Sequence, residues 1–257
     1  MAGRTLKRFT RVYVDGYDMS GYSRTIGPLL WEFEPVDLTA DLGDSVKGYL
    51  PGTPTISPGT LNTVFDNTAT TGAHAVLSAQ NDDRVVLVTI GDRAAPAEGN
   101  PAFMGEFLQL GYHADEDGGS IVANVPFGPW EGSSLIAYGQ PWGTLAHALG
   151  AETAANSEDG YDDGCGAATS YGGYIVWHVT AGDGTATIKL QHCDTADGAF
   201  ADVGGLTSGV IDCSSVQTGL AVTTAKTTTI NQFVRWQVAL GTATTLTFVL
   251  GFMRGRY

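Results

Sequence analysis

Carboxylates gather in two short stretches of the sequence, and clustered carboxylates can bind a hard cation or exchange protons. The first stretch, HADEDGGS, brings Asp115, Glu116 and Asp117 together. It lacks the D-x-[DN]-x-[DN]-G frame and the distal glutamate of a calcium loop. We therefore interpret it as a polar turn exposed to water, and expect no metal there.

The second acidic stretch is EDGYDDG. Its carboxylates are those of Glu158, Asp159, Asp162 and Asp163. Glycines separate them, which is typical of a loop. We interpret this stretch as a solvated loop, with weak binding of a hard cation as the alternative.

No residue pattern typical of catalysis or cofactor binding is found. The five histidines are dispersed, without an i, i+4 pair or an H-E-x-x-H frame: His74, His113, His147, His178 and His192. The sequence GDGTAT suggests a hairpin, across which facing positions for His178 and His192 are one interpretation; we prefer ordinary core or surface roles for both. GDGTAT lacks the lysine of a phosphate loop, and no G-x-S-x-G nucleophile elbow exists. We expect a protein that is not an enzyme, with no catalytic residue, no cofactor and no metal.

Five tryptophans are spread along the chain: Trp31, Trp130, Trp142, Trp177 and Trp236. Spaced aromatics in a β-rich chain serve mainly as core or interface anchors, and we prefer that interpretation. A sugar-stacking face, as in a lectin-like carbohydrate-binding β module, is the alternative.

Charged residues make up only 16% of the 257 residues, and 35 residues are glycine. A soluble domain usually has about a quarter of its residues charged. This composition favours a chain that hides much of its surface in an assembly, although strands rich in Thr, Ser and Gly would give the same figure. The net charge of −14 argues against a basic surface that binds DNA.

The sequence predicts neither a signal peptide nor a membrane span. Basic residues at the N-terminus are not followed by an apolar stretch, and no run reaches the roughly 18 apolar residues of a membrane helix. The cysteines, Cys165, Cys193 and Cys213, are odd in number and lack metal-ligand spacing. We expect free thiols in a reducing cytosol.

Alternating apolar and polar residues predict strands along most of the chain, so the expected fold is mainly β. FTRVYVDGYD and HADEDGGSIVANV are each predicted to turn at glycine, after Asp15 and Asp117. A short helix is expected over residues 70–80, where Ala73, Val76 and Leu77 follow helical spacing.

Residues 43–68 are rich in proline and glycine. Proline cannot donate to a central ladder, so we expect an edge, a loop or an extended arm here. The residues that define this feature are Gly48, Pro51, Gly52, Pro54, Pro58 and Gly59.

Two β domains are expected, divided near residue 130. Both halves contain strand, turn and strand, ending in PF at Phe127 and in GF at Phe252. Residues 1–130 would form one domain. Residues 131–257 would form a tandem copy of it or an added surface sandwich.

Several segments resemble the major tail proteins of long-tailed bacteriophages. They are RFTRVYVDGYDMSGYSRTIGPL, VPFGPW, and the run from GGYIVWHVTAGDG to FVLGFMRG. The resemblance implies a β-sandwich or half-barrel with a short flanking helix. It also implies copies that polymerise into stacked rings, as hexamers or as pseudo-sixfold trimers, to form a virion tail tube.

In such a protein residues 43–68 would be the arm between rings. Other tail proteins would contact the tube ends, no membrane would be involved, and double-stranded DNA would pass without tight binding. The alternative within virions is a capsid decoration protein.

A conduit for DNA should not hold phosphates. No lysine or arginine lies between Lys47 and Arg84 or between Arg93 and Lys189. We therefore place the strands that end at Phe127 on the wall of the conduit. Asp115, Glu116 and Asp117 are the candidates for its lumen or rim.

Overall fold

The computed structural model describes residues 7–37, 49–79, 83–92, 94–130, 132–133, 138–157, 159–214 and 218–255. Within them the chain is mainly β. One α-helix, α1 (Ala73–Leu77), and one 3-10 turn, η1 (Lys7–Phe9), accompany the strands. The prediction of a mainly β fold with one short helix is confirmed, and the helix occupies the middle of the range 70–80.

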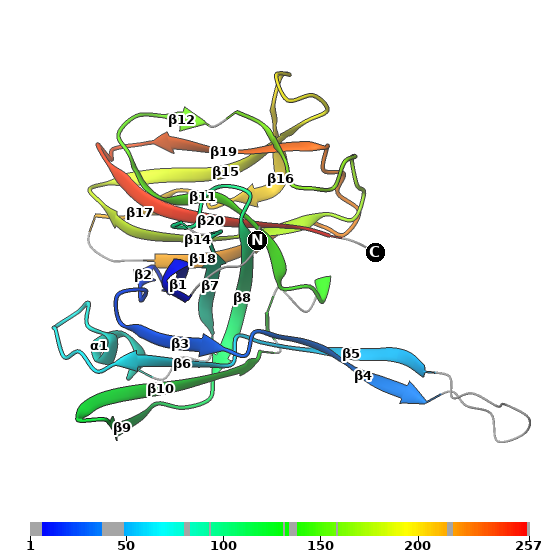
Figure 1. The fold of residues 1–257 in the computed structure, drawn as a ribbon. Helices are drawn as coiled ribbons and strands as arrows, with labels where there is room; N and C mark the ends of the chain where they lie inside the picture. The colour runs from blue at the N-terminus through cyan, green and yellow to red at the C-terminus, as the bar shows by residue number, and fades with distance from the viewer. Residues whose placement is uncertain are drawn as a thin grey trace, which may run out of the picture.

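The largest sheet has twelve strands. Its main path runs β18 (Thr218–Thr223), β14 (Gly173–Gly182), β20 (Leu246–Arg254), β11 (Trp142–Glu152), β8 (Pro101–Gln109), β10 (Ser120–Pro129), β6 (Thr60–Val64) and β3 (Ser23–Gly27). Off this path lie β1 (Thr10–Val14), β2 (Tyr17–Asp18), β7 (Arg84–Ile90) and β9 (His113–Asp117). Figure 1 shows that the sheet bends, because β18, β14, β20 and β11 lie above β3, β6, β10 and β9.

A six-stranded sheet covers one face of the upper strands (Figure 1). It consists of β12 (Asn156–Ser157), β19 (Phe233–Leu240), β15 (Thr185–Cys193) and β16 (Ala201–Thr207), with β13 (Tyr161–Asp162) and β17 (Ile211–Asp212) at its sides. Ile188 and Trp236 of this sheet pack with Trp177 and Phe248 of the large sheet in one core cluster. The two sheets therefore form a sandwich.

Strands β14 and β20 are buried on both faces. Ile175 and Trp177 belong to the core inside the sandwich, whereas Tyr174 and Val176 belong to a second core with β1, β7, β8 and α1. A strand that is covered on both faces has no solvent-exposed side, so polar residues do not alternate with apolar ones along it. That explains the nearly continuous apolar sequences GYIVWHV and FVLGFM.

Both predicted glycine turns are present. Asp15 and Gly16 have φ values of 49° and 86° and join β1 to β2. Gly118 and Gly119, with φ values of 61° and 82°, join β9 to β10. Two-residue hairpin turns require such positive values because they match the twist of the strands.

The predicted hairpin at GDGTAT is wrong, and the strand-turn-strand unit that ends at Phe252 does not form a hairpin either. Strand β14 pairs with β18 and β20, while β15 pairs with β16, β17 and β19. Strand β20 likewise joins the large sheet and β19 the small one. In both places the chain crosses from one sheet of the sandwich to the other, because alternation is identical for a hairpin and for such a crossing.

The large sheet contains strands from both halves of the chain. Its path passes from β8 to β11, where Phe103 lies opposite Trp142. The two core clusters nevertheless draw mainly on residues before and after position 130, respectively. The division into domains 1–130 and 131–257 remains a prediction.

His178 connects the upper strands to the turn between β1 and β2. Its Nδ1 accepts a hydrogen bond of 3.0 Å from the backbone N–H of Gly16, and its ring stacks on Tyr13. The side chain is fully buried. Burial disfavours the charged imidazolium and lowers the pKa of His178 to about 3.

We expect acid to destabilise the fold through His178. Between the ordinary histidine pKa of about 6.5 and the lowered value of about 3, only the unfolded chain binds the proton. The free energy of unfolding should therefore fall with pH in this window, by at most about 1.4 kcal/mol per pH unit. Urea unfolding at several pH values measures this slope.

His178→Asn is the matched variant, because its side-chain oxygen can accept the Gly16 hydrogen bond without titrating. The variant should lose this component of the pH slope, although its stability at neutral pH is lower because the contact with Tyr13 is lost. Equal slopes for the two proteins would contradict the assignment.

Candidate assembly surfaces

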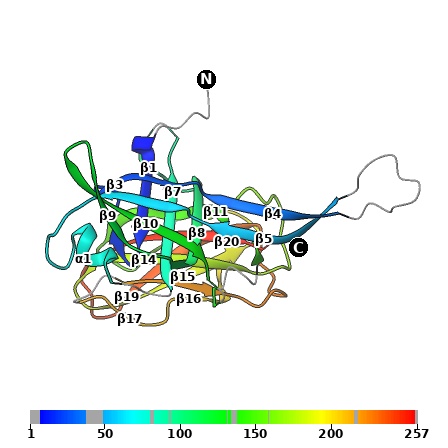
Figure 2. The same ribbon diagram turned by 90° about the horizontal axis from the view of Figure 1, so that it is seen from below.

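A two-stranded hairpin projects from the body of the protein. It consists of β4 (Leu30–Asp37) and β5 (Tyr49–Ser57), which pair only with each other among the described residues. Figures 1 and 2 show it extending to one side, well beyond the other strands. We call this element the projecting hairpin. An isolated two-stranded hairpin is marginally stable in water, so this element needs support from other surfaces.

The two faces of the projecting hairpin differ. Register places Trp31 and Phe33 of β4 on the same face as Pro54 and Ile56 of β5. This face turns towards the body at the base of the hairpin, where Trp31 Nε1 donates a hydrogen bond of 2.8 Å to the carbonyl of Gly139, although Trp31 and Phe33 remain 40% and 45% exposed. Pro54 and Ile56 border an apolar cavity of about 330 Å³ that also contacts Phe107 and Pro129.

The opposite face of the hairpin carries Glu32, Glu34, Val36 and Leu50. Val36 and Leu50 are 47% and 54% exposed, and the two glutamates are also exposed. Single exposed apolar residues are common, but a row of them on an element that stands away from its own core marks an interaction surface.

The predicted arm of residues 43–68 does not coincide with the projecting hairpin. The hairpin begins at Leu30, and β6, inside the predicted range, belongs to the large sheet. Of the six residues that defined the arm, Pro51, Gly52 and Pro54 lie on β5, and Gly48 lies outside the described residues.

Pro58 and Gly59 follow β5 at the base of the projecting hairpin. Gly59 has a φ of 73° and packs against Gly27, leaving no space for a Cβ. Ser57 Oγ donates to the carbonyl of Phe127 at 2.7 Å and accepts from Gly59 N–H. These contacts fix the base of the hairpin to the body.

The prolines shape how the hairpin can interact. Pro35 lies opposite Pro51, and the register slips between Phe33 and Pro35. A proline cannot donate to an added strand. The hairpin is therefore suited to contacts through its side chains rather than to β-sheet extension.

A second surface is the outer face of the four strands β3, β6, β10 and β9. Asn62 and Asn124 lie opposite each other there and share a side-chain hydrogen bond of 2.5 Å. Alternation places Asp115 and Asp117 on this same face, where they lie opposite Val122 and Ser120 of β10. We call it the polar sheet face.

All three predicted lumen or rim residues lie on strand β9 and are exposed, so the interpretation of HADEDGGS as a turn is wrong except at its two glycines. Asp117 forms an ion pair of 2.5 Å with Arg24, the one lysine or arginine in these four strands. Glu116 points to the other side of the strand by alternation.

The EDGYDDG stretch is more ordered than a solvated loop. Asp162 accepts hydrogen bonds from Gln232 and from the N–H groups of Gly164 and Gly166, which lower its pKa. Asp163 is 5% exposed and pairs with Arg254 at 2.8 Å. Glu158 lies outside the described residues.

No three side chains of His, Cys, Asp or Glu in the described part of the chain are grouped so as to hold a metal ion. His178 and His192 do not face each other: they lie in different sheets, and His192 accepts a hydrogen bond from Asn231 N–H. The three cysteines are free, as predicted. None of the described helices has the length and apolarity required to cross a membrane.

The tryptophans do not share a surface. Trp177 and Trp236 are buried in the sandwich core, and Trp142 packs on Phe103 in the other core. Trp31 lies on the projecting hairpin, and Trp130 borders the cavity beside it. The five tryptophans therefore do not form the shared sugar-stacking face that was the alternative interpretation.

Neither a protein-family model nor a curated protein sequence matches the chain. Among solved structures it is similar to the SPP1 Dit (gp 19.1) protein, described as a paradigm of the hub adsorption apparatus in phages that infect Gram-positive bacteria. The identity is 12%, the TM-score is 0.32, and the alignment covers 95% of this chain and 98% of the other. At this TM-score the similarity carries no argument about function.

Proposed function

We propose that this protein is a structural subunit of the tail of a long-tailed bacteriophage. Its copies close into rings, as hexamers or pseudo-sixfold trimers, and the rings stack into the tail tube through which the genome passes. The sequence resemblance supports this class, and so does the low charge content of the chain. The protein would be assembled in the host cytoplasm and reside in the virion, with other tail proteins at the tube ends.

The observation that carries the proposal is the projecting hairpin. It extends beyond the core and exposes apolar side chains on a face turned away from its own body. A second copy can cover that face, and an element that reaches from one copy onto another gives a head-to-tail contact. Repeated head-to-tail contacts generate rings or open filaments.

Open strand edges supply a route to ring closure. Strands β3 and β9 form the two margins of the polar sheet face, and each pairs with one neighbour among the described residues. Unpaired edges are prone to pair with other chains. Pairing β9 of one copy with β3 of the next would join these sheets into a closed wall.

The polar sheet face has the chemistry of a wall that DNA can slide past. Beside Val64, which is 43% exposed, it presents amides, hydroxyls and carboxylates, and Arg24, the one lysine or arginine in these strands, is paired with Asp117. Tight binding of DNA depends on lysines and arginines that neutralise its phosphates, and this face offers few such contacts.

Sedimentation velocity over a rising protein concentration tests the proposal. We expect the boundary to shift from monomer to very large species as concentration increases. A monomer at every concentration would contradict self-assembly as the function.

The assembled protein should not bind duplex DNA measurably at physiological salt. Fluorescence anisotropy with a labelled duplex, titrated at low and at physiological salt, measures this. A pair of variants tests the polar sheet face: Asn62→Lys and Asn124→Lys together should create salt-sensitive binding, whereas lysine at exposed Val210 should not. Micromolar, salt-sensitive binding by the unaltered assembly would contradict the conduit.

A further inference from the structure

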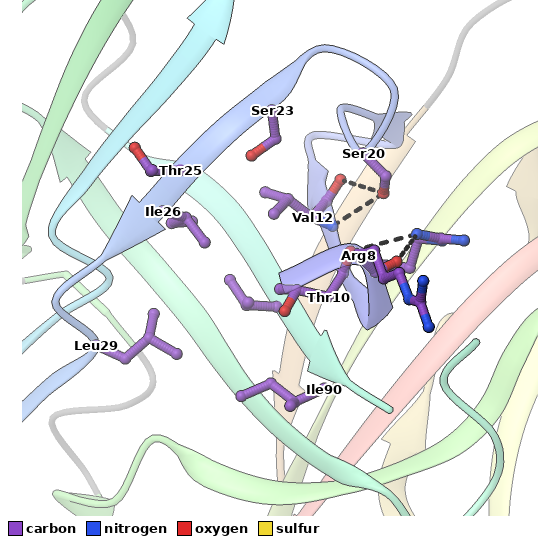
Figure 3. A pocket seen from close by; sticks show the side chains of 11 residues that line it. Arg8, Thr10, Val12, Ser20, Ser23, Thr25, Ile26, Leu29 and Ile90 are labelled. Atoms are coloured by element: carbon purple, nitrogen blue, oxygen red, sulfur yellow. Dashed lines mark hydrogen bonds between the residues drawn. The ribbon is translucent and has the colours of Figure 1, made fainter. Parts of the chain in front are cut away.

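A cavity of about 510 Å³ opens between β1 and β3, close to the base of the projecting hairpin. Figure 3 shows Ile26 and Leu29 on one side of it, Val12 and Ile90 on the other, and Arg8 at its edge. The volume lies within the range of about 300–1,000 Å³ that is typical of binding pockets. None of the contacts described above uses this cavity.

The mouth of the cavity carries two arginines without an acidic partner among the described residues. Arg8 lies over the ring of Phe9 at 4.7 Å, and Arg11 donates to the backbone carbonyl of Arg8 at 3.2 Å. The other arginines that line cavities or cores pair with carboxylates, as Arg84 does with Asp15 and Arg254 does with Asp163. In a chain with twice as many acids as bases, two unpaired guanidinium groups at one opening indicate a site for an anionic partner.

The cavity below these arginines is lined mainly by apolar side chains, with the hydroxyl groups of Thr10, Ser20, Ser23 and Thr25 among them. Val12, Ile26, Leu29, Val88 and Ile90 contribute branched aliphatic side chains. Burying an apolar side chain against these aliphatic groups is favourable, whereas burying a phosphate group against them is not. The partner should therefore combine carboxylates with aliphatic groups.

The outward face of the projecting hairpin has this combination. It presents Glu32 and Glu34 beside Val36 and Leu50, and no lysine or arginine occurs in β4 or β5. The same chain thus carries a cationic apolar cavity and an anionic apolar projection. The hairpin extends away from β1 and β3, the strands that border the cavity (Figure 2), so it can reach the cavity of another copy.

We propose that the cavity between β1 and β3 is the receptor for the outward face of the projecting hairpin of a second copy. Val36 and Leu50 enter the cavity, and Glu34 meets Arg8 and Arg11 at its mouth. This inference rests on the proposed self-assembly and assigns its stacking contact to particular residues. Because donor and receptor are different surfaces, the contact leaves one of each free and allows unlimited addition.

Site-directed cross-linking tests the contact. Two differently tagged proteins, one with Thr25→Cys at the cavity and one with Leu50→Cys on the hairpin, are mixed and mildly oxidised, with Cys165 and Cys193 replaced by serine in both. We expect a heterodimer to form about tenfold faster than with Val210→Cys, an exposed control site away from the hairpin. Equal rates would overturn the assignment, whichever assembly the protein forms.

Charge reversal adds a second readout. Arg8→Glu with Arg11→Glu should raise the concentration needed for assembly about tenfold or more, and Glu32→Lys with Glu34→Lys should restore assembly when mixed with it. Circular dichroism confirms that both remain folded. Normal assembly of the arginine variant would overturn the receptor and leave the proposed function standing. Absence of assembly by the unaltered protein would instead contradict the proposed function.

The test also reports the competing occupant. If the unaltered protein binds a labelled oligonucleotide and the arginine variant does not, the cavity recognises phosphate, and the proposed hairpin contact is wrong.

Discussion

Replacing residues 32–55 with an Asn-Gly turn is expected to abolish assembly and leave a folded monomer. Trp31 and Ile56 already lie opposite each other, which is the spacing that a two-residue turn requires. Residues 32–37 and 49–55, the part of this segment that the structure describes, contribute no buried core side chain. The deletion therefore removes the exposed apolar face and its glutamates without opening the interior.

Sedimentation velocity and thermal unfolding measure the two halves of this prediction. The variant should remain a monomer where the full chain forms large species, with a Tm close to that of the parent. Val210→Ser is the matched control, because it removes an exposed apolar side chain elsewhere and should assemble normally. A truncated chain that assembles like the parent would show that the hairpin is not the stacking element.

The second large effect is expected at Arg254. Its guanidinium pairs with Asp163 and donates to the carbonyls of Ile230, Asn231 and Gln232, and both charged side chains are at most 5% exposed. Arg254→Met would leave the Asp163 carboxylate buried without its cation. Breaking a buried pair in this way costs about 3–5 kcal/mol.

Urea unfolding measures the loss at Arg254. Arg254→Met combined with Asp163→Asn should recover part of the stability, since no charge is then left unpaired. Lys189→Met removes an exposed pair with Asp202 and should cost at most about 1 kcal/mol. A similar small cost at both positions would contradict the structural role of the Arg254 pair.

Local sequence patterns were sufficient to predict the class of fold. Asp15-Gly16 and Gly118-Gly119 mark their turns because only a few residue types tolerate positive φ. The helix was predictable from the spacing of Ala73, Val76 and Leu77, which are all buried on one side. In these places the local requirement and the tertiary structure agree.

Strand pairing could not be read from the same patterns. The strand after GDG faces the same core whether it folds back on β14 or crosses to the other sheet, so its alternation is identical in both cases. The contacts of the acidic residues depend on distant partners: Asp117 meets Arg24, and Asp163 meets Arg254. Nothing near either aspartate in the sequence indicates its partner.

The arm was located only in part for a related reason. Prolines marked β5, but β4 has the alternation of an ordinary strand, and only its pairing with β5 makes it part of the projection. The outward face of the hairpin can be identified only from the structure. Strand register shows which residues share a face with Trp31, and Trp31 is hydrogen-bonded to the body.

Negative-stain electron microscopy of the purified full-length protein tests the central claim most directly. We predict rings and stacked tubes with an open channel, whose abundance rises with protein concentration and which disappear when residues 32–55 are replaced. Uniform single particles of monomer size, at concentrations well above those used for sedimentation, would contradict a tube-forming subunit.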